Sequence, residues 1–495
     1  MGSTTEFMVA IELGSTRITG VAGQKNADGS LGILAYADED ARACIRKGVI
    51  FNIDKTAGAI TSIINKLEAA LDAGISRVYV GISGQSLRTI KSTVGKNLDN
   101  DTRITPDIVN DLIRTDRNAD IDSGLEILEV IPQEYKVGSG MQIDPIGVVS
   151  NHIEGRFLNI VAQVSMKRQI ERCFELAKTR IAGFFISPIE MSKAVLTEAE
   201  QRSGCALIDF GAETTTVMVF KDHLLRHLVV LPLGGNNINK DICSLKIEEC
   251  DAEELKIKYG KAYTEPSEFT NKDSRTYTFG VDNNNISESQ LCEIIEARQE
   301  EIISNMWYQI KLSGYDDKLM SGIIITGGAS AMNGLQTAIA KKTGIEKIRV
   351  ASYVNVPVES VTAELLSHNG RHCTLLGMLA SSELNCCEQE PIAPLFNDEG
   401  EASVTDVQQE RQAKEEEIRK LQEEAALTAA KEQEAQAALL REAELKKQRE
   451  LEEELAAQQR AKLEAEKEEK RKNSLQNRLS RWGKKLIDDL INGED

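Results

Sequence analysis

The feature that most constrains this fold is a pair of similar strand–turn–strand segments placed 197 positions apart. In each segment an apolar run ends in an acidic residue, Glu12 or Asp209, and a short glycine-containing turn leads directly into a second apolar run. Glycine lets an anion approach the backbone closely, and the N–H groups of a tight turn can point at one phosphate. Each segment alone would more often be an ordinary hairpin. Because the segment occurs twice, we predict two similar half-molecules that hold one polyphosphate between their turns.

A third motif follows further along the chain, at residues 322–330. An apolar, strand-like run ends in the turn Gly327-Gly328-Ala329, just before a predicted helix. Backbone without bulky side chains can lie flat against an adenine or a ribose. The order of the three motifs resembles that of the actin and Hsp70 ATPase superfamily, in which they are called phosphate 1, phosphate 2 and adenosine.

The remaining pattern predicts two α/β lobes and an insertion. The stretch from Asp54 to Ala73 predicts an amphipathic helix that ends at Gly74, and a strand-like run follows it, as in an α/β unit. A region that breaks this rhythm contains a predicted strand that is stopped by Pro132. The predicted order is lobe 1 at 1–83, an inserted subdomain at 84–163, a return to lobe 1 at 164–203, and lobe 2 at 204–385.

Four further segments resemble the FtsA family of bacterial cell-division proteins. They are residues 130–135, 144–147, 196–200 and 225–242. The resemblance covers roughly residues 7–385. It implies an α/β, actin-like, two-lobed ATPase fold in which the insertion is a subdomain called 1C.

The resemblance also implies which residues hold MgATP. The phosphate contacts would come from both turns and the adenosine contacts from the third motif: Gly14, Ser15, Thr16, Gly211, Ala212, Thr214, Thr215, Gly327, Gly328 and Ala329. Glu12 and Asp209 would orient water on Mg²⁺, an ion that binds few protein ligands directly. Glu253 and Lys256, one helical turn apart, would contact the ribose and the adenine. Without the other motifs we would interpret them as a solvated ion pair.

Three departures from the superfamily pattern bear on hydrolysis. Glu12 stands where Asp is usual, Ala212-Glu213 replaces two turn glycines, and residues 186–188 lack the glutamate with which many hydrolysing relatives position water. Glu213 also adds a negative charge close to the predicted phosphates. We therefore expect ATP to be bound and hydrolysed slowly at most, with the nucleotide controlling polymerisation.

The charge balance argues against nucleic acid as a partner. The formal net charge is −19, whereas general nucleic-acid binding needs a basic face. The nine cysteines include no Cys-x-x-Cys pair, which is typical of a protein in a reducing cytosol. Neither His368 with His372 nor Cys386 with Cys387 has the usual spacing of a metal site. No apolar run approaches the ~18 residues of a membrane-spanning helix, so we expect any membrane contact to be peripheral.

The composition changes abruptly after a predicted linker at 386–400. Residues 401–472, rich in Glu, Lys, Ala and Leu, predict a charged helical spacer that resembles a coiled coil, although the heptads are irregular; a solvated, semi-rigid linker is the alternative. Residues 473–495 predict an amphipathic helix with an apolar stripe and basic neighbours: Leu475, Leu479, Trp482, Leu486 and Leu490, with Arg478, Arg481, Lys484 and Lys485. This pattern is typical of a helix that lies on an anionic membrane, and docking into a protein groove is the alternative. The FtsA resemblance favours the membrane.

The leading hypothesis is a structural adaptor for cell division. The resemblance implies an ATP-dependent filament of self-associated copies, tied by the C-terminal helix to the cytoplasmic face of the inner membrane at the division site. It also implies that lobe 2 anchors the tubulin-like protein FtsZ and that the insertion recruits later division proteins. The alternative is an ATP-dependent enzyme of the same superfamily, either a small-molecule kinase or an Hsp70-like chaperone. A chaperone should continue into a β-rich domain after residue 390, so the charged tail disfavours it.

Overall fold

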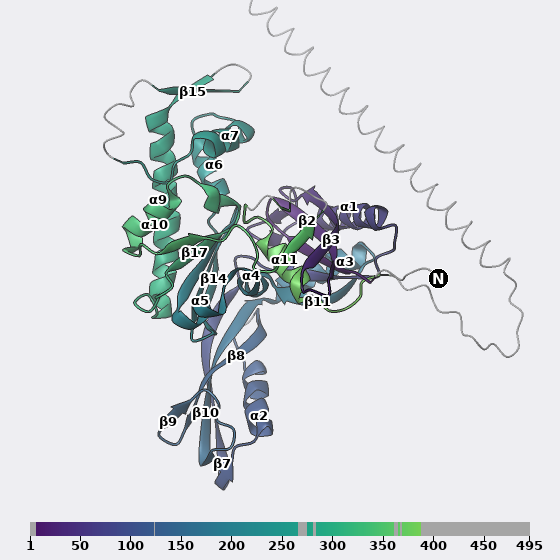
Figure 1. Ribbon diagram of the computed structural model, residues 1–495, viewed down its shortest axis with the longest axis vertical. Coiled ribbons are helices and arrows are strands. Elements are labelled where there is room, and N and C mark those ends of the chain that lie inside the picture. The colour runs from purple at the N-terminus through teal and green to yellow at the C-terminus, as the bar shows by residue number, and fades with distance from the viewer. Residues whose placement is uncertain are drawn as a thin grey trace, which may run out of the picture. The chain divides into compact units, whose positions relative to one another are not determined.

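Two β-sheets form the framework of the described chain (Figure 1). In the first, six strands run in the order β11-β6-β1-β2-β3-β19. Their bounds are β1 Met8–Leu13, β2 Arg17–Lys25, β3 Leu31–Asp40, β6 Arg77–Ile82, β11 Arg180–Ile186 and β19 Val358–Ser360. The computed structural model describes residues 6–122, 124–265, 275–280, 284–360, 365–366 and 369–387. The predicted spacer and terminal helix lie outside the described residues.

The second sheet has nine strands, in the order β18-β17-β12-β13-β14-β7-β10-β8-β9. Five of them form the second lobe: β12 Cys205–Phe210, β13 Thr215–Lys221, β14 Leu224–Leu231, β17 Ile323–Thr326 and β18 Ile348–Val350. The other four belong to the insertion: β7 Arg88–Arg103, β8 Leu125–Val137, β9 Gly140–Gln142 and β10 Val149–Gln163. A single residue pair, Val229 with Arg88, joins the two groups.

The two lobes repeat one strand arrangement, as the duplicated sequence segment predicts. In the first lobe β1 pairs with β2 in antiparallel fashion and with β6 in parallel. In the second lobe β12 pairs with β13 and β17 in the same two ways. One hydrophobic core links both lobes, because residues such as Leu207 and Met218 pack in the same cluster as Ile11 and Val80. The central strands are therefore buried on both faces, which explains their nearly continuous apolar sequence.

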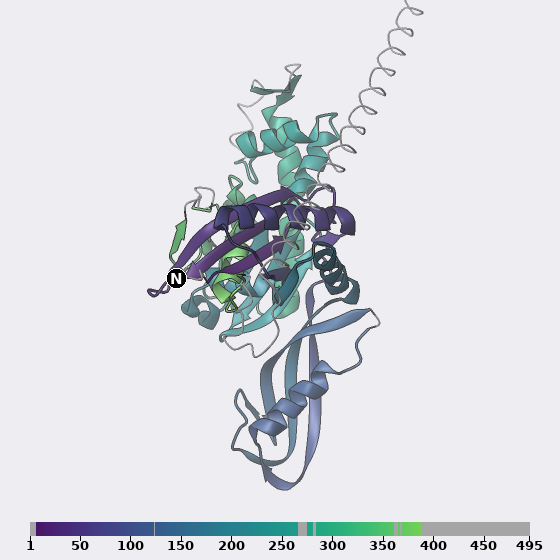
Figure 2. The same ribbon diagram turned by 90° about the vertical axis from the view of Figure 1, so that its right-hand side faces the viewer.

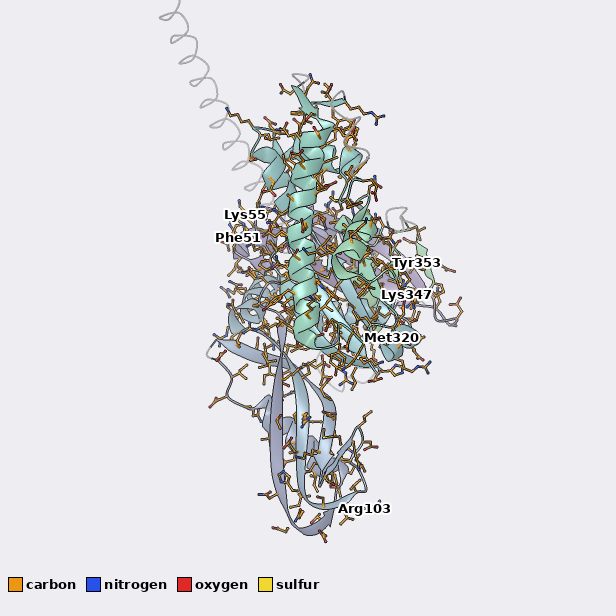
Figure 3. All side chains as sticks on the ribbon, turned by 90° about the vertical axis from the view of Figure 1, so that its left-hand side faces the viewer. Phe51, Lys55, Arg103, Met320, Lys347 and Tyr353 are labelled. Atoms are coloured by element: carbon orange, nitrogen blue, oxygen red, sulfur yellow. The ribbon has the colours of Figure 1, made fainter. Side chains whose placement is uncertain are left out.

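Helices cover the sheets. They are α1 Ile53–Leu71, α2 Pro106–Arg117, α3 Val164–Leu176, α4 Ser187–Val195, α5 Glu198–Ser203, α6 Gly235–Cys243, α7 Glu249–Tyr259, α9 Glu288–Ser313, α10 Leu335–Thr343 and α11 Cys373–Ser381, with the 3₁₀ turn η1 Gly328–Ala331. Two short hairpins complete the described elements: β4 Ile45–Arg46 with β5 Val49–Ile50, and β15 Thr276–Phe279 with β16 Asn284–Ser287. Figure 3 shows the long helix α9, which packs on β13 and β14.

Helix α1 begins close to its predicted start and ends earlier than predicted. The side chain of Asn52 accepts a hydrogen bond from the backbone N–H of Lys55 and caps the first turn. Buried residues Ile60 and Leu67 lie on the face that the periodicity predicts. The helix stops at Leu71 rather than at Gly74, because Asp72 takes a left-handed conformation (φ +50°) and already closes the C-terminal turn.

The insertion is a sheet of four strands with α2 lying across it (Figure 2). It has its own small core, which includes Ile104, Leu112, Tyr135 and Phe157. Strand β8 runs through Pro132 instead of stopping there, which corrects the prediction. The ladder with β10 shifts register beside this proline, and a bulge of this kind accommodates a residue that has no N–H group to donate.

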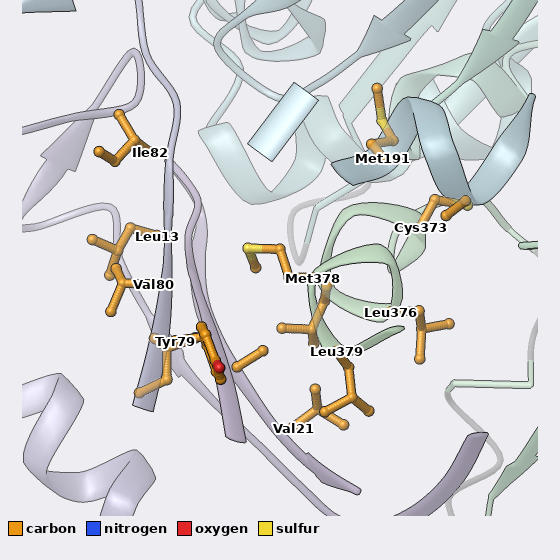
Figure 4. Close-up of a cluster of buried hydrophobic side chains, with 14 of the residues drawn as sticks. Leu13, Val21, Tyr79, Val80, Ile82, Met191, Cys373, Leu376, Met378 and Leu379 are labelled. Carbon is orange, nitrogen blue, oxygen red and sulfur yellow. The ribbon is translucent and has the colours of Figure 1, made fainter. Parts of the chain in front are cut away.

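The chain returns to the first lobe before its described part ends. Strand β19 pairs in parallel with β3, and α11 packs on α4, β1 and β2. Figure 4 shows Met378 and Leu379 of α11 within the buried cluster of the first lobe. The predicted lobe 2 range, 204–385, is therefore too long. Apolar side chains along α11 cover the face of the first sheet, and no motif in the sequence marks this return.

Replacing Gly377 with alanine should destabilise the contact between α11 and α4. A Cβ at this position would lie 2.5 Å from the backbone carbonyl oxygen of Glu190, and both belong to packed helices. We expect Gly377→Ala to lower the free energy of unfolding by about 1–3 kcal/mol, the usual effect of overpacking a buried site. Urea unfolding of the full chain measures this change.

Gly58→Ala is the matched control, because Gly58 also lies in a helix but has nothing within 4 Å of an added Cβ. Alanine at this position should raise the free energy of unfolding by about 0.5–1 kcal/mol through helix propensity. Equal effects of the two substitutions would contradict the close approach of α11 and α4.

Candidate functional site

The two glycine turns have the same geometry. The N–H of Gly14 donates to the carbonyl oxygen of Arg17 at 3.1 Å, and the N–H of Gly211 donates to that of Thr214 at 2.9 Å. In each hairpin four residues lie between the two residues of the last ladder pair. These pairs are Leu13 with Ile18 in the first lobe and Phe210 with Thr215 in the second. The structure therefore places two copies of one turn, one in each lobe.

The acids that precede these turns lie close enough to interact electrostatically. Burial, followed by the charge of Asp209, raises the pKa of Glu12 to about 8, although a hydrogen bond with Thr374 opposes the shift. Burial raises the pKa of Asp209 to about 6. Glu12 comes from the first lobe and Asp209 from the second. The structure thus brings the two sequence-predicted acids together between the lobes.

The glycine turn of the third motif lies against Asp209. Gly327 has a φ of +87°, and an added Cβ would collide with the Asp209 carboxylate and with the carbonyl oxygen of Phe210. Both the positive φ and the lack of space for a Cβ therefore require glycine at this position. The next residue, Gly328, lies against the side chain of Arg371, 3.4 Å from the position of an added Cβ.

The predicted ribose and adenine contacts form a half-buried cluster beside these turns. Lys256 Nζ lies 2.5 Å from Glu253 Oε2 and donates to the carbonyl oxygen of Gly235 at 3.3 Å. Asn239 also donates to Glu253. Burial raises the pKa of Glu253, but the bonds from Lys256 and Asn239 outweigh it and hold that pKa below its ordinary value. The Lys256 side chain is 10% exposed and that of Glu253 is 43% exposed, so only the lysine end of the pair is shielded from solvent.

Helix α6 connects this cluster to the second turn. The N–H of Gly235 donates to the carbonyl oxygen of Gly211 at 3.0 Å, and that of Asn236 donates to Ala212 at 2.6 Å. An added Cβ on Gly235 would lie 3.4 Å from the Cβ of Ala329. The phosphate 2 turn, the adenosine turn and Lys256 therefore meet at the N-terminus of α6.

Two predicted hydroxyl donors have other partners in the structure. Thr215 is fully buried and donates its hydroxyl to the carbonyl oxygen of Leu233 at 2.8 Å, so it does not offer this group to a phosphate. Thr215 is the first residue of β13, and the strand is buried from Thr215 to Phe220. Ser15 lies in the first turn, where its Oγ accepts the N–H of Gly48 at 2.9 Å. Thr16 and Thr214 lie in the turns as predicted and are half-buried.

Several residues of the site were missed by sequence reasoning. Thr374 and Cys373, at the start of α11, lie beside the two acids; burial raises the pKa of Cys373 to about 11, and the charges of Asp209 and Glu12 add to this. Arg371 lies over the adenosine turn. These three follow the last motif and carry no signal in the sequence. Gly235 could have been found from the sequence, because it lies in one of the segments that carry the family resemblance.

The arrangement fits a nucleotide with one divalent cation. Two half-buried turns each follow an acid whose pKa burial raises, and a cation would favour the ionised forms of both acids. Within the described ranges no group of three or more His, Cys, Asp or Glu side chains could hold a metal ion. A site with two carboxylates suits Mg²⁺, which keeps most of its own water.

Comparisons with known proteins agree with this geometry. A family model described as cell division protein FtsA matches residues 206–370, and one described as the SHS2 domain inserted in FTSA matches residues 84–161. The cell division protein FtsA of Porphyromonas gingivalis is 29% identical over 348 residues, covering 70% of this chain and 72% of that protein. FtsA of Escherichia coli is 24% identical over 363 residues, covering 71% and 85%.

A solved structure of the PilM-PilN type IV pilus biogenesis complex matches with a TM-score of 0.53 at 14% identity, covering 77% of this chain and 99% of the other. This likeness concerns the fold alone. Together with the matched inserted domain, it confirms the predicted α/β, actin-like fold with its inserted subdomain.

The two acids predict a pH dependence of stability in the absence of magnesium and nucleotide. The folded chain holds a proton on Glu12 up to a pKa of about 8, whereas the unfolded chain loses it near 4.5. The folded state therefore binds more protons across this window, and its stability should fall as the pH rises from about 5 to about 8. Thermal unfolding of the full chain at pH 6 and pH 8.5, without Mg²⁺, measures the difference.

Glu12→Gln should flatten this dependence and raise the melting temperature at pH 8.5, because the neutral amide replaces a buried carboxylate that carries charge there. Glu198→Gln, on the exposed start of α5, is the control and should keep the slope of the unchanged chain. A Glu12→Gln variant with an unaltered slope would show that Glu12 does not hold the extra proton.

Proposed function

The chain belongs to the FtsA family of cell division proteins, and from that premise we propose that it is an ATP-binding, filament-forming protein that links FtsZ to the inner membrane. Its role in cell division follows from the family. The nucleotide, the filament, the membrane and the partners are the proposal. The observation that supports nucleotide binding is the proximity of Glu12 and Asp209, each of which precedes a turn closed by the same backbone hydrogen bond.

In the proposed complex each group of residues has its own task. The turns at Gly14–Thr16 and Gly211–Thr214 hold the phosphates, mainly through backbone N–H groups. Gly327 to Ala329 lie against the adenosine, with Lys256 and Glu253 at the ribose and adenine. Mg²⁺, when bound, neutralises phosphate charge, and Glu12 and Asp209 orient its water ligands.

Hydrolysis is proposed to be slow at most. Relatives that hydrolyse ATP use a glutamate near the position of Ser187, and here the hydroxyl of Ser187 is buried against Gly81 of β6. This side chain therefore offers no carboxylate to position an attacking water. We propose that the nucleotide controls polymerisation rather than driving rapid turnover.

The proposed membrane contact and the proposed partners involve regions outside the nucleotide site. Among the described residues no helix is long and apolar enough to cross a membrane. The proposed membrane contact is the amphipathic sequence at 473–495, which lies outside the described residues. The proposed partners are FtsZ at the second lobe, later division proteins at the insertion, and further copies of the chain. The proposed place is the cytoplasmic face of the inner membrane at the division site.

Lys256→Ala should weaken MgATP binding by about tenfold, because it removes a buried cation that donates to Gly235 and orders Glu253. Isothermal titration calorimetry of the full chain measures the dissociation constant. Lys258→Ala is the matched control, since Lys258 lies on the same helix but pairs with Glu254 at the exposed surface. Equal affinities of the two variants would remove Lys256 from the nucleotide site.

Vesicle co-sedimentation tests the membrane part. The full chain with ATP should sediment with anionic vesicles, whereas a chain ending at Lys472 and a Trp482→Glu variant should stay in the supernatant, because both lose the apolar stripe that enters the lipid interface. Binding of all three forms, or of none, would contradict the membrane role of the terminal sequence.

The same vesicles test the link to FtsZ. Purified FtsZ should sediment with them only when the full chain is present. No recruitment of FtsZ in any nucleotide state would count against the adaptor role while leaving nucleotide binding intact.

A further inference from the structure

A short turn in the first lobe lies between the two phosphate turns. Lys47 and Gly48 connect β4 to β5, and both have positive φ angles, +52° and +72°. The N–H of Lys47 donates to Glu213 Oε2 at 2.7 Å, and the N–H of Gly48 donates to Ser15 Oγ at 2.9 Å. Two consecutive backbone donors of the Lys47–Gly48 turn thus contact the phosphate 2 turn and the phosphate 1 turn.

The acceptor from the second lobe is a carboxylate, which has the chemistry of an anionic ligand. Glu213 is the third residue of the turn from Gly211 to Thr214, and it is half-buried. Its oxygen reaches the backbone of a residue 166 positions away, in the other lobe. A backbone N–H that binds a carboxylate at this distance can equally bind a phosphate oxygen.

The geometry of the Lys47–Gly48 turn is tightly fixed. A Cβ on Gly48 would lie 2.6 Å from the Cα of Gly84, so a side chain cannot be placed there without moving the backbone. The carbonyl oxygen of Lys47 accepts the N–H of Gln85 at 3.1 Å. Because Gly48 packs against Gly84 and the Lys47 carbonyl is bonded, the Lys47 N–H keeps its direction whether or not Glu213 accepts it.

The side chain of Lys47 adds a cation to this turn. It is half-buried, and within the described part of the chain no acidic group pairs with its ammonium. An ammonium that has no acidic partner, carried by a residue whose backbone bonds to a phosphate turn, can bind a further phosphate oxygen. The carboxylate of Glu213 accepts a hydrogen bond from the backbone N–H of this lysine and forms no ion pair with its ammonium.

We propose that the Lys47–Gly48 turn is a third anion-binding turn of the nucleotide site, and that the Glu213 carboxylate fills its place for a terminal phosphate until a nucleoside triphosphate displaces it. This inference rests on the proposed binding of nucleotide between the two turns. A diphosphate lacks the terminal group and leaves Glu213 where it is. Glu213 therefore opposes the triphosphate selectively, and Lys47 favours it.

Nucleotide affinities of four full-length proteins test the selectivity. They are the unchanged chain, Glu213→Gln, Glu213→Gly and the control Asp222→Asn, which removes one charge from the exposed turn after β13 at a left-handed position that asparagine tolerates. Calorimetric titration with MgATP and with MgADP gives the dissociation constants. Both Glu213 variants should bind MgATP about tenfold more tightly, with MgADP changed about threefold at most, and the control should match the unchanged chain.

Hydrogen exchange at the Lys47 amide gives a second readout. In the free Glu213→Gly protein this amide should lose the protection that it has in the unchanged chain. MgATP should restore the protection and MgADP should not, because only the triphosphate brings an oxygen to this donor. Lys47→Met should lower the affinity for MgATP about tenfold and leave that for MgADP nearly unchanged.

The outcomes separate this inference from the proposed function. Equal changes for both nucleotides, no change in any Glu213 variant, or protection restored by MgADP would overturn the role of Glu213 while nucleotide binding stands. If folded, unchanged protein binds neither nucleotide, the proposed function itself fails and the inference fails with it.

Discussion

The structure depends on holding two acidic side chains, one from each lobe, in the same partly buried space. Glu12 and Asp209 end equivalent strands, and burial, followed by the charge of Asp209, raises the pKa of Glu12 far above that of an exposed glutamate. Keeping such a pair together is unfavourable unless a proton or a cation compensates the charge. Burial of apolar side chains in the core shared by the two sheets offsets the free-energy cost of holding the two acids together. Each lobe alone would carry an ordinary hairpin.

Local features of this arrangement could be predicted from the sequence, because each turn is encoded within about ten residues. The duplicated turns, the adenosine glycines and the Glu253–Lys256 pair are all short-range patterns. The return of α11 to the first lobe could not be predicted, since it depends on contacts between Gly377 and Glu190 that no local signal reports. Thr215 shows a different limit. Thr214 lies in the turn whereas Thr215 begins β13 and bonds to Leu233, and the run of three threonines does not show where the strand starts.

The structure shows what contacts are made by two residues that depart from the superfamily pattern. Ala212 and Glu213 stand where two glycines are usual, and the Glu213 carboxylate accepts a hydrogen bond from the backbone of the opposite lobe. Ser187 stands where a glutamate positions water in hydrolysing relatives, and it packs against Gly81. The Glu213 change adds a contact between the lobes. Both changes support the proposal that the chain hydrolyses nucleotide slowly at most.

The protons held by the free site have a consequence for ligand binding. With a pKa of about 8 on Glu12 and about 6 on Asp209, the ligand-free protein carries less negative charge at neutral pH than these two carboxyl groups suggest. A divalent cation bound as proposed would favour the ionised form of Glu12 and release its proton. The heat of binding would then include the ionisation heat of the buffer that takes up this proton, and alkaline conditions would favour the bound form.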